Sequence, residues 1–131
     1  MAETQRKIKS FIDLDAWKEA HKLVLMIYEA TGNFPRTEIF GLTAQIRRAV
    51  VSVTSNVAEG FSRRTFKEKV RFYSMALGSL TETQSQLIIA RDVKYLEENE
   101  FNKIVDQTIK VAKIMNGLIK SSKFQIPDSK F

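Results

Sequence analysis

Cysteine is absent from the chain, and histidine is represented by His21 alone. The lack of thiols excludes disulfides, zinc–thiolate sites and a cysteine nucleophile. A di-iron site in a helical bundle needs Glu-x-x-His pairs, and the residue three positions before His21 is Lys18. We therefore expect no metal and no cofactor.

Long apolar runs are also lacking. The longest, from Leu23 to Tyr28, is far shorter than the roughly 20 residues that a membrane span requires. Residues 1–13 are polar and contain no apolar segment typical of a signal peptide. From these absences we expect a cytoplasmic protein with no membrane partner.

No set of side chains typical of a catalytic site stands out. His21 lies between Trp17 and Val24 on an apolar helical face, where a hydrogen-bonded structural histidine is the favoured interpretation. Asn56 and Glu59 could form a polar pocket, but we expect Asn56 to bond to neighbouring groups and Glu59 to pair with a basic side chain. A phosphate-binding glycine loop is missing as well. The sequence therefore favours a protein that is not an enzyme; an enzyme would need a cofactor that no motif announces.

Apolar residues at helical spacing are what the chain has in abundance. The clearest series runs through the second quarter of the sequence and comprises Leu42, Ile46, Ala49, Val50, Val53 and Val57. Similar series predict four helices, from residue 14 to 31, from 37 to about 60, from 66 to about 90 and from about 100 to 120. Because the connections are short, we predict an all-α fold, an antiparallel up-down-up-down four-helix bundle.

Local signals refine these boundaries. Asp13 or Asp15 is a candidate N-cap of the first helix, Gly32 a candidate stop, and Thr65 with Glu68 matches a capping box. Gly41, Gly78 and Gly117 interrupt helical patterns, which predicts close helix approaches at these three positions. We expect one domain with an N-terminal segment (1–13), the bundle (14–120) and a C-terminal tail (121–131) whose Phe124, Ile126 and Phe131 could dock on a partner.

Positive charge is unevenly distributed. The chain has 21 basic and 15 acidic residues, and its net charge of +6 is concentrated in residues 36–72 and 101–131. Arginine matches phosphate geometry, so basic clusters suggest nucleic-acid backbone as a ligand. The candidate phosphate contacts are Arg47, Arg48, Arg63, Arg64, Lys67, Lys69, Arg71, Lys110 and Lys113. The alternatives left open are an ordinary solvated face and, for Arg47 and Arg48, ion pairs in an oligomer interface.

Several ordered motifs resemble one family. They are Phe34-Pro35, the run from Phe40 to Ala49 (FGLTAQIRRA), the run from Ser55 to Gly60 (SNVAEG) and the run from Ala76 to Leu80 (ALGSL). In this combination the chain resembles the four-helix-bundle proteins encoded in intervening sequences of bacterial 23S rRNA genes, also called the S23 ribosomal protein family. The resemblance extends from about Phe11 to Ile119, and Thr54 and Thr83 depart from the family pattern without endangering the fold.

The resemblance implies more than the residues do. The family is associated with five-membered rings and is similar to the accessory protein of diversity-generating retroelements, which binds a reverse transcriptase and nucleic acid. Five copies at +6 each would carry +30, which favours salt-sensitive binding of RNA or DNA. Catalysis is not implied.

Two hypotheses follow. The first is a homo-oligomeric, pentameric accessory protein that binds RNA or DNA backbone through its basic patches. The second is a scaffold that recruits a reverse transcriptase or another protein and has no direct role with nucleic acid.

Overall fold

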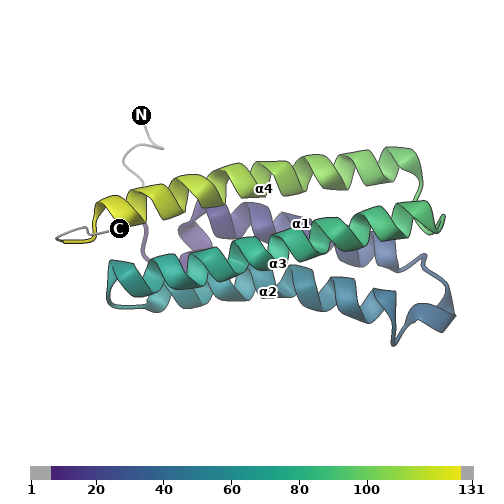
Figure 1. Cartoon of the computed structure of the whole chain (residues 1–131), viewed down its shortest axis with the longest axis horizontal. Helices are drawn as coiled ribbons and strands as arrows, with labels where there is room; N and C mark the ends of the chain where they lie inside the picture. Colours follow the sequence, from purple (N-terminus) through teal and green to yellow (C-terminus); the bar gives the residue numbers. More distant parts are fainter. Residues whose placement is uncertain (1–6, 128–131) are drawn as a thin grey trace.

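The computed structural model describes residues 7–127 and contains four long helices. They are α1 (Asp15–Thr31), α2 (Leu42–Ser62), α3 (Phe66–Asp92) and α4 (Glu98–Phe124), with two short 3₁₀ helices, η2 (Phe11–Asp13) and η3 (Arg36–Glu38). Figure 1 shows that successive helices run in opposite directions. Within the described residues no strand is present. The all-α four-helix bundle is thus confirmed.

The four helices form a square in which each helix touches two others. α1 packs against α2 and α4, and α3 packs against the same two helices. Across residues 7–127 no Cα atom of α1 lies within 8 Å of one in α3, and none of α2 lies within 8 Å of one in α4. The α2–α3 connection, the start of α1 and the end of α4 lie at one end of the bundle (Figure 1).

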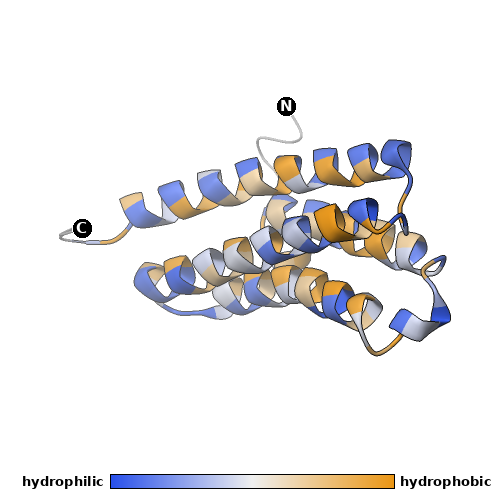
Figure 2. Ribbon diagram, turned by 45° about the vertical axis from the view of Figure 1, so that its right-hand side comes forward, coloured by the Kyte–Doolittle hydropathy of each residue, from blue (hydrophilic) through white to orange (hydrophobic). Residues whose placement is uncertain are grey.

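The predicted apolar series supplies the core. Ile46, Val50, Val53 and Val57 of α2 are fully buried, together with side chains from the other three helices that include Leu23, Ile27, Leu80, Leu87, Ile104 and Met115. Each such burial contributes roughly 1.5–3 kcal/mol before conformational entropy is counted. Figure 2 shows that apolar segments also reach the outside of the helices.

The start of α2 differs from its prediction near residue 37. Residues 36–38 form η3, and the helix begins only at Leu42, whose backbone N–H donates to Glu38 Oε1 at 2.9 Å. Pro35 precedes η3 in extended geometry. The delayed start arises because the Glu38 carboxylate satisfies an orphan amide that a continuous helix would have bonded internally.

The starts of α1 and α3 also depend on side chains. Asp13 forms a capping box with Ser10 at the start of η2. The N-cap residue of α1 is instead Leu14, which makes no side-chain capping bond. For α3 the prediction is confirmed: the Thr65 hydroxyl accepts from the Glu68 backbone N–H at 3.1 Å.

The last helix is longer than expected. α4 continues to Phe124, beyond the predicted tail boundary at residue 121, and Ser122 is buried within the bundle. A small buried side chain at this position lets the helix continue against its neighbours. Phe124 is exposed and Ile126 is partly buried; Phe131 lies outside the described residues.

Two sequence expectations about single residues are wrong. His21 is exposed and stacks on the Trp17 ring at 4.7 Å between centroids, and its side chain makes no hydrogen bond within residues 7–127, so it is not the expected hydrogen-bonded histidine. A Cβ added at Gly78 or Gly117 would meet nothing within 4 Å, so neither glycine marks a close helix approach. Gly41 is the N-cap residue of α2, outside the helix, and a Cβ there would meet the Glu38 carboxylate.

Candidate nucleic-acid interface

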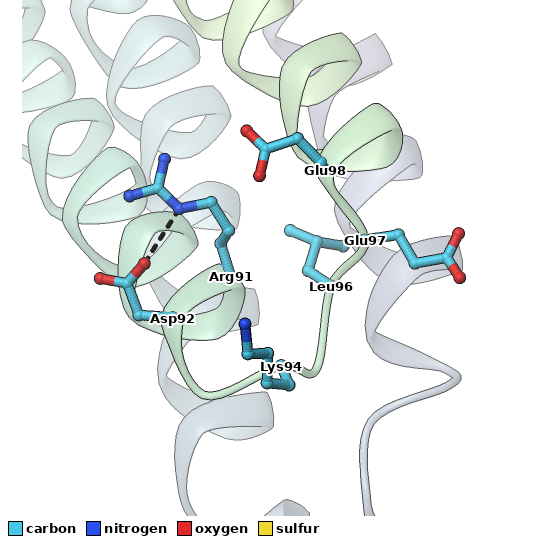
Figure 3. Close-up of a pocket in the computed structure, with 6 residues that line it drawn as sticks. All are labelled: Arg91, Asp92, Lys94, Leu96, Glu97 and Glu98. Carbon is cyan, nitrogen blue, oxygen red and sulfur yellow. Dashed lines mark hydrogen bonds and ion pairs between the residues drawn. The ribbon is translucent and has the colours of Figure 1, made fainter.

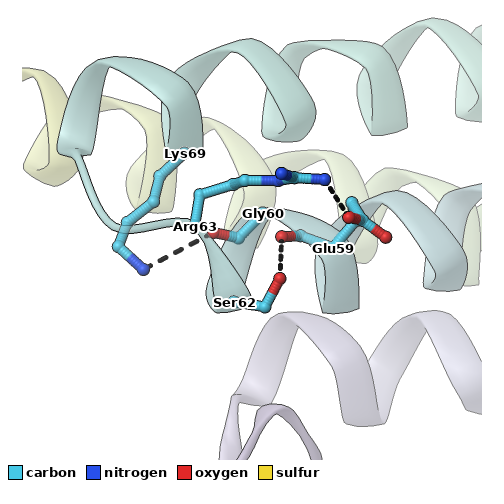
Figure 4. Close-up of polar contacts among 5 residues, drawn as sticks. All are labelled: Glu59, Gly60, Ser62, Arg63 and Lys69. Carbon is cyan, nitrogen blue, oxygen red and sulfur yellow. Dashed lines mark hydrogen bonds and ion pairs between the residues drawn. The ribbon is translucent and has the colours of Figure 1, made fainter.

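The connection between α2 and α3 carries the densest basic cluster, and two of its side chains close the end of α2. Lys69 Nζ donates to the Phe61 carbonyl oxygen at 2.6 Å. It also donates to the Gly60 carbonyl oxygen at 3.5 Å (Figure 4). Desolvation lowers the pKa of Lys69. Because the last carbonyls of a helix have no internal partner, Lys69 acts as a C-terminal cap of α2.

Arg63 is held by α2 and α3 together. Its guanidinium pairs with Glu59, one turn earlier (Figure 4). The same guanidinium lies 4.6 Å from the centroid of the Phe72 ring. The expected pairing of Glu59 with a basic neighbour is confirmed. Arg63 and Lys69 therefore have intramolecular roles and are less available to phosphate than their charge suggests.

Three basic side chains at this connection and in the first two turns of α3 remain open to solvent. Arg64, Lys67 and Arg71 are exposed, and none of them forms an ion pair within residues 7–127. The Arg71 guanidinium lies 5.6 Å from the Phe72 ring centroid. We refer to Arg64, Lys67 and Arg71 as the open basic cluster.

The close approach of α2 and α3 fixes where this cluster lies. A Cβ added to the buried Gly60 would be 2.6 Å from Tyr73 Cε1 and 3.1 Å from Phe72 Cβ. Only glycine allows this approach without displacing an aromatic ring. Asn56, one turn earlier, bonds within its own helix through Nδ2 to the Ser52 carbonyl at 2.9 Å, as expected for a structural role.

Arg47 and Arg48, adjacent in sequence, have different surroundings. Arg47 Nε donates to the Thr31 hydroxyl at 2.8 Å, and its guanidinium lies 4.6 Å from the Tyr28 ring centroid, so it joins α2 to α1. Arg48 is exposed and lines a shallow depression between α2 and α3 with Ser52, Ser79 and Glu82. The Ser79 hydroxyl donates to the Ser52 hydroxyl at 2.8 Å there.

The candidates on α4 divide in the same way. Both lysines are exposed, but Lys110 Nζ lies 3.4 Å from Glu19 Oε1, whereas Lys113 forms no ion pair within residues 7–127. A hydrogen bond from Gln107 and then the charge of Lys110 lower the pKa of Glu19 against the effect of desolvation. Neither lysine belongs to the open basic cluster, because both lie in the middle part of α4.

The structure thus separates the nine predicted residues. Arg47, Arg63, Lys69 and Lys110 contact groups of this chain, whereas Arg48, Arg64, Lys67, Arg71 and Lys113 face solvent. Three of the five solvent-facing residues lie together at one end of the bundle. Formal charge alone could not make this distinction, because the partners come from other turns and other helices.

A larger depression lies at the opposite end, at the α3–α4 connection (Figure 3). It measures about 490 Å³ and is lined by Arg91, Asp92, Lys94, Leu96, Glu97 and Glu98. Arg91 Nε lies 3.0 Å from Asp92 Oδ1, and its guanidinium covers the Phe101 ring at 4.5 Å. Its lining contains both acidic and basic side chains, so its charge does not favour an anion over a cation.

Two other kinds of site are absent from residues 7–127. No group of three or more acidic, histidine or cysteine side chains is placed to hold a metal ion. No helix there combines the length and apolar character needed to cross a membrane.

Comparison with known proteins agrees with the fold. A family model described as 23S rRNA-intervening sequence protein matches residues 12–117. A crystal structure of a protein of unknown function from the S23 ribosomal protein family of Bacteroides thetaiotaomicron VPI-5482 is similar, with a TM-score of 0.74 and 17% sequence identity. The match covers 80% of this chain and 95% of the other. No curated protein matches the sequence.

Proposed function

The chain belongs to the 23S rRNA-intervening sequence protein family, and on that premise we propose that it is a non-enzymatic, homo-oligomeric, cytoplasmic protein that binds RNA or DNA backbone. The observation that carries this proposal is the open basic cluster. Arg64, Lys67 and Arg71 lie within eight residues of one another, are exposed, and have no acidic partner within residues 7–127.

The surroundings of this cluster favour an anion. Lys120 and Lys123 lie near the end of α4, at the same end of the bundle. Between residues 63 and 71 the sequence has a single acidic residue, Glu68. The first turn of α3 adds the partial positive charge of a helix N-terminus. Such a surface binds phosphate backbone without reading its sequence.

Exposed apolar residues on two opposite sides of the bundle support self-association. On the α1–α2 side Leu25, Tyr28 and Val51 are exposed. On the α3–α4 side Ile88 and Ile109 are exposed next to the half-buried Val105. Two different patches on opposite sides favour a head-to-tail contact, which closes into a ring when the rotation between copies permits it. We propose a pentameric ring, as the family resemblance implies.

The test of backbone binding is a charge-reversal comparison. We expect Arg64→Glu/Lys67→Glu/Arg71→Glu to weaken binding of both an RNA hairpin and a DNA duplex. The slope of log K against log salt should fall by about 0.7 to 0.9 for each phosphate that the variant no longer neutralises. Fluorescence anisotropy across a salt series measures both quantities.

The matched control has the same change in net charge elsewhere. Lys18→Glu/Lys22→Glu/Lys103→Glu reverses three exposed lysines of α1 and α4. It should reduce affinity through the long-range field alone and therefore by less than the cluster variant. An equal decrease of affinity in the two variants, or an affinity that does not change with salt concentration, would contradict the proposal.

Two exposed phenylalanines favour the second candidate, a scaffold for a reverse transcriptase or another protein. Phe40 is 94% exposed before α2 and Phe124 is 89% exposed at the end of α4. If this candidate is correct, a partner should be recovered with the protein after nuclease treatment and should be missing with Phe40→Ser or Phe124→Ser. Release of the partner on nuclease treatment would instead favour the nucleic-acid proposal.

A further inference from the structure

A second cavity lies beside the open basic cluster. It measures about 220 Å³ and opens between the start of α3 and the last turns of α4. Its lining residues are Leu14, Phe61, Phe66, Lys69, Tyr73, Leu118, Ser121, Ser122 and Gln125. Its volume corresponds to that of about seven liquid waters, which is room for one flat ring system.

The lining combines aromatic walls with polar groups that lack a full set of partners. Tyr73 is only 2% exposed, and its hydroxyl makes no hydrogen bond within residues 7–127. Burial raises the pKa of Tyr73 to about 12, so the hydroxyl keeps its proton and remains a donor at neutral pH. The hydroxyl is not one of the fully buried atoms that lack a partner, so in the cavity it is open to an acceptor on a ligand or to water.

Lys69 lines the same cavity, and its Nζ lies 5.3 Å from the centroid of the Phe61 ring. Two of its N–H groups are directed at the Phe61 and Gly60 carbonyls, and an ammonium has three. Ser122 is buried in the lining, and Gln125 stands at its exposed edge. The cavity therefore offers stacking surfaces from Phe61 and Phe66 and several hydrogen-bonding groups.

Its position links it to the backbone-binding residues. Phe66 begins α3, between Arg64 and Lys67 in the sequence, and its side chain lines the cavity while theirs face solvent. A nucleotide likewise has a flat base next to a charged phosphate. Aromatic stacking of bases beside a basic surface is how single strands are bound without strict sequence reading.

We propose that this cavity receives one unpaired base of a bound RNA or DNA strand, stacked against Phe66, while the adjoining phosphates contact Arg64 and Lys67. This inference rests on the proposed function, because it names the form of nucleic acid that the same surface prefers. Bases inside a duplex are stacked and inaccessible, so the preferred ligand is a single strand, loop or bulge.

The test uses a single-stranded RNA containing 2-aminopurine and a fully paired duplex of the same sequence. We expect Phe66→Ala to weaken single-strand binding by about ten-fold, the decrease typical of one stacked base, and to leave duplex binding unchanged. Tyr73→Phe keeps the ring and removes only the hydroxyl, so it should reduce single-strand affinity less. Binding should change the 2-aminopurine fluorescence, and Phe66→Ala should reduce that change.

Phe40→Ala is the control, because it removes a more exposed ring, 94% against 39% for Phe66, from the other end of the bundle. It should leave single-strand affinity unchanged. Equal single-strand affinity in Phe66→Ala and the parent protein, with normal duplex binding, would overturn the base pocket and leave backbone binding intact. Failure of the parent protein to bind either oligonucleotide would overturn the proposed function itself.

Discussion

Arg47 and Arg64 differ in their contacts and in their exposure to solvent. Arg47 rests against the Tyr28 ring and donates to the Thr31 hydroxyl, whereas Arg64 is exposed at the α2–α3 connection. A guanidinium that is already stacked and hydrogen-bonded would have to leave these partners to bind phosphate. Arg47 therefore contributes to stability, whereas Arg64 stays available for the proposed phosphate contact.

This assignment predicts the effect of Arg47→Gln. Without the interactions with Tyr28 and Thr31, the free energy of unfolding should be lower by about 1–2 kcal/mol, and RNA affinity should stay nearly unchanged. Urea denaturation followed by circular dichroism measures the first quantity. Arg48→Gln, at the exposed neighbouring position, should leave stability unchanged. A stable Arg47→Gln variant that no longer binds RNA would reverse the assignment.

Lys94 offers a prediction about the backbone. It adopts a φ of 72°, and the Tyr95 N–H bonds to the Ala90 carbonyl oxygen at 2.9 Å, in the pattern that ends helices with a left-handed residue. Lys94→Gly should raise the free energy of unfolding by about 1 kcal/mol, because glycine adopts this geometry without a steric penalty. Lys94→Ala, which retains a Cβ, should bring no such gain in thermal or urea unfolding.

At the scale of the helices, glycine has opposite effects at two positions. Gly60→Ala should destabilise the fold by about 1–3 kcal/mol, because the new methyl group would overlap the Tyr73 ring and force α2 and α3 apart. Gly78→Ala should stabilise α3 by about 1 kcal/mol, because the added methyl group meets nothing. Denaturant midpoints of the two variants should therefore move in opposite directions; parallel shifts would show that the helix approach is misassigned.

One carboxylate connects the beginning of α2 to the α3–α4 connection. Glu38 accepts from the Leu42 N–H through one oxygen and from the Tyr95 hydroxyl through the other, at 2.8 Å. These bonds, that of Leu42 foremost, hold the pKa of Glu38 below its ordinary value of 4.5. The same carboxylate raises the pKa of Tyr95.

The lowered pKa fixes the sign of a pH effect. The ionised Glu38 stabilises the folded state above pH 4.5, and this contribution disappears as the pH falls through the lower pKa of the folded protein. Glu38→Gln should therefore be less stable than the parent at pH 7, and the difference should shrink in acid. Urea unfolding at several pH values measures this, with Glu29→Gln as an exposed control. A difference that does not vary with pH would contradict the role of the charge.

At the scale of the whole molecule, the two exposed apolar sides predict which surfaces would meet in the proposed ring. Leu25 lies on the α1 side and Ile109 on the α4 side next to α3, so Leu25→Glu and Ile109→Glu should each prevent ring formation. In an equimolar mixture each variant retains the side that the other lacks. Light scattering should then detect heterodimers in the mixture and monomers in the separate samples. A mixture that stays monomeric would exclude the head-to-tail contact.

The sequence was least informative about the binding surface. It identified the basic residues around this connection, but it could not tell that Lys69 caps α2 or that Arg63 stacks on Phe72. The cavity beside Phe66 was missed, because it forms between α3 and the end of α4, which are far apart in the sequence. The aromatic residues among the basic ones were its only signal.

The sequence by itself determined the fold class, the number of long helices and the buried faces such as Ile46, Val50 and Val57. Helical periodicity is local, and an apolar face must be buried wherever it occurs. The tertiary structure decided which charged residues face solvent, where α2 begins and where the cavity opens. Those features depend on partners from other elements, as when Arg47 reaches Thr31 and Glu38 reaches Tyr95, and no local pattern encodes such interactions.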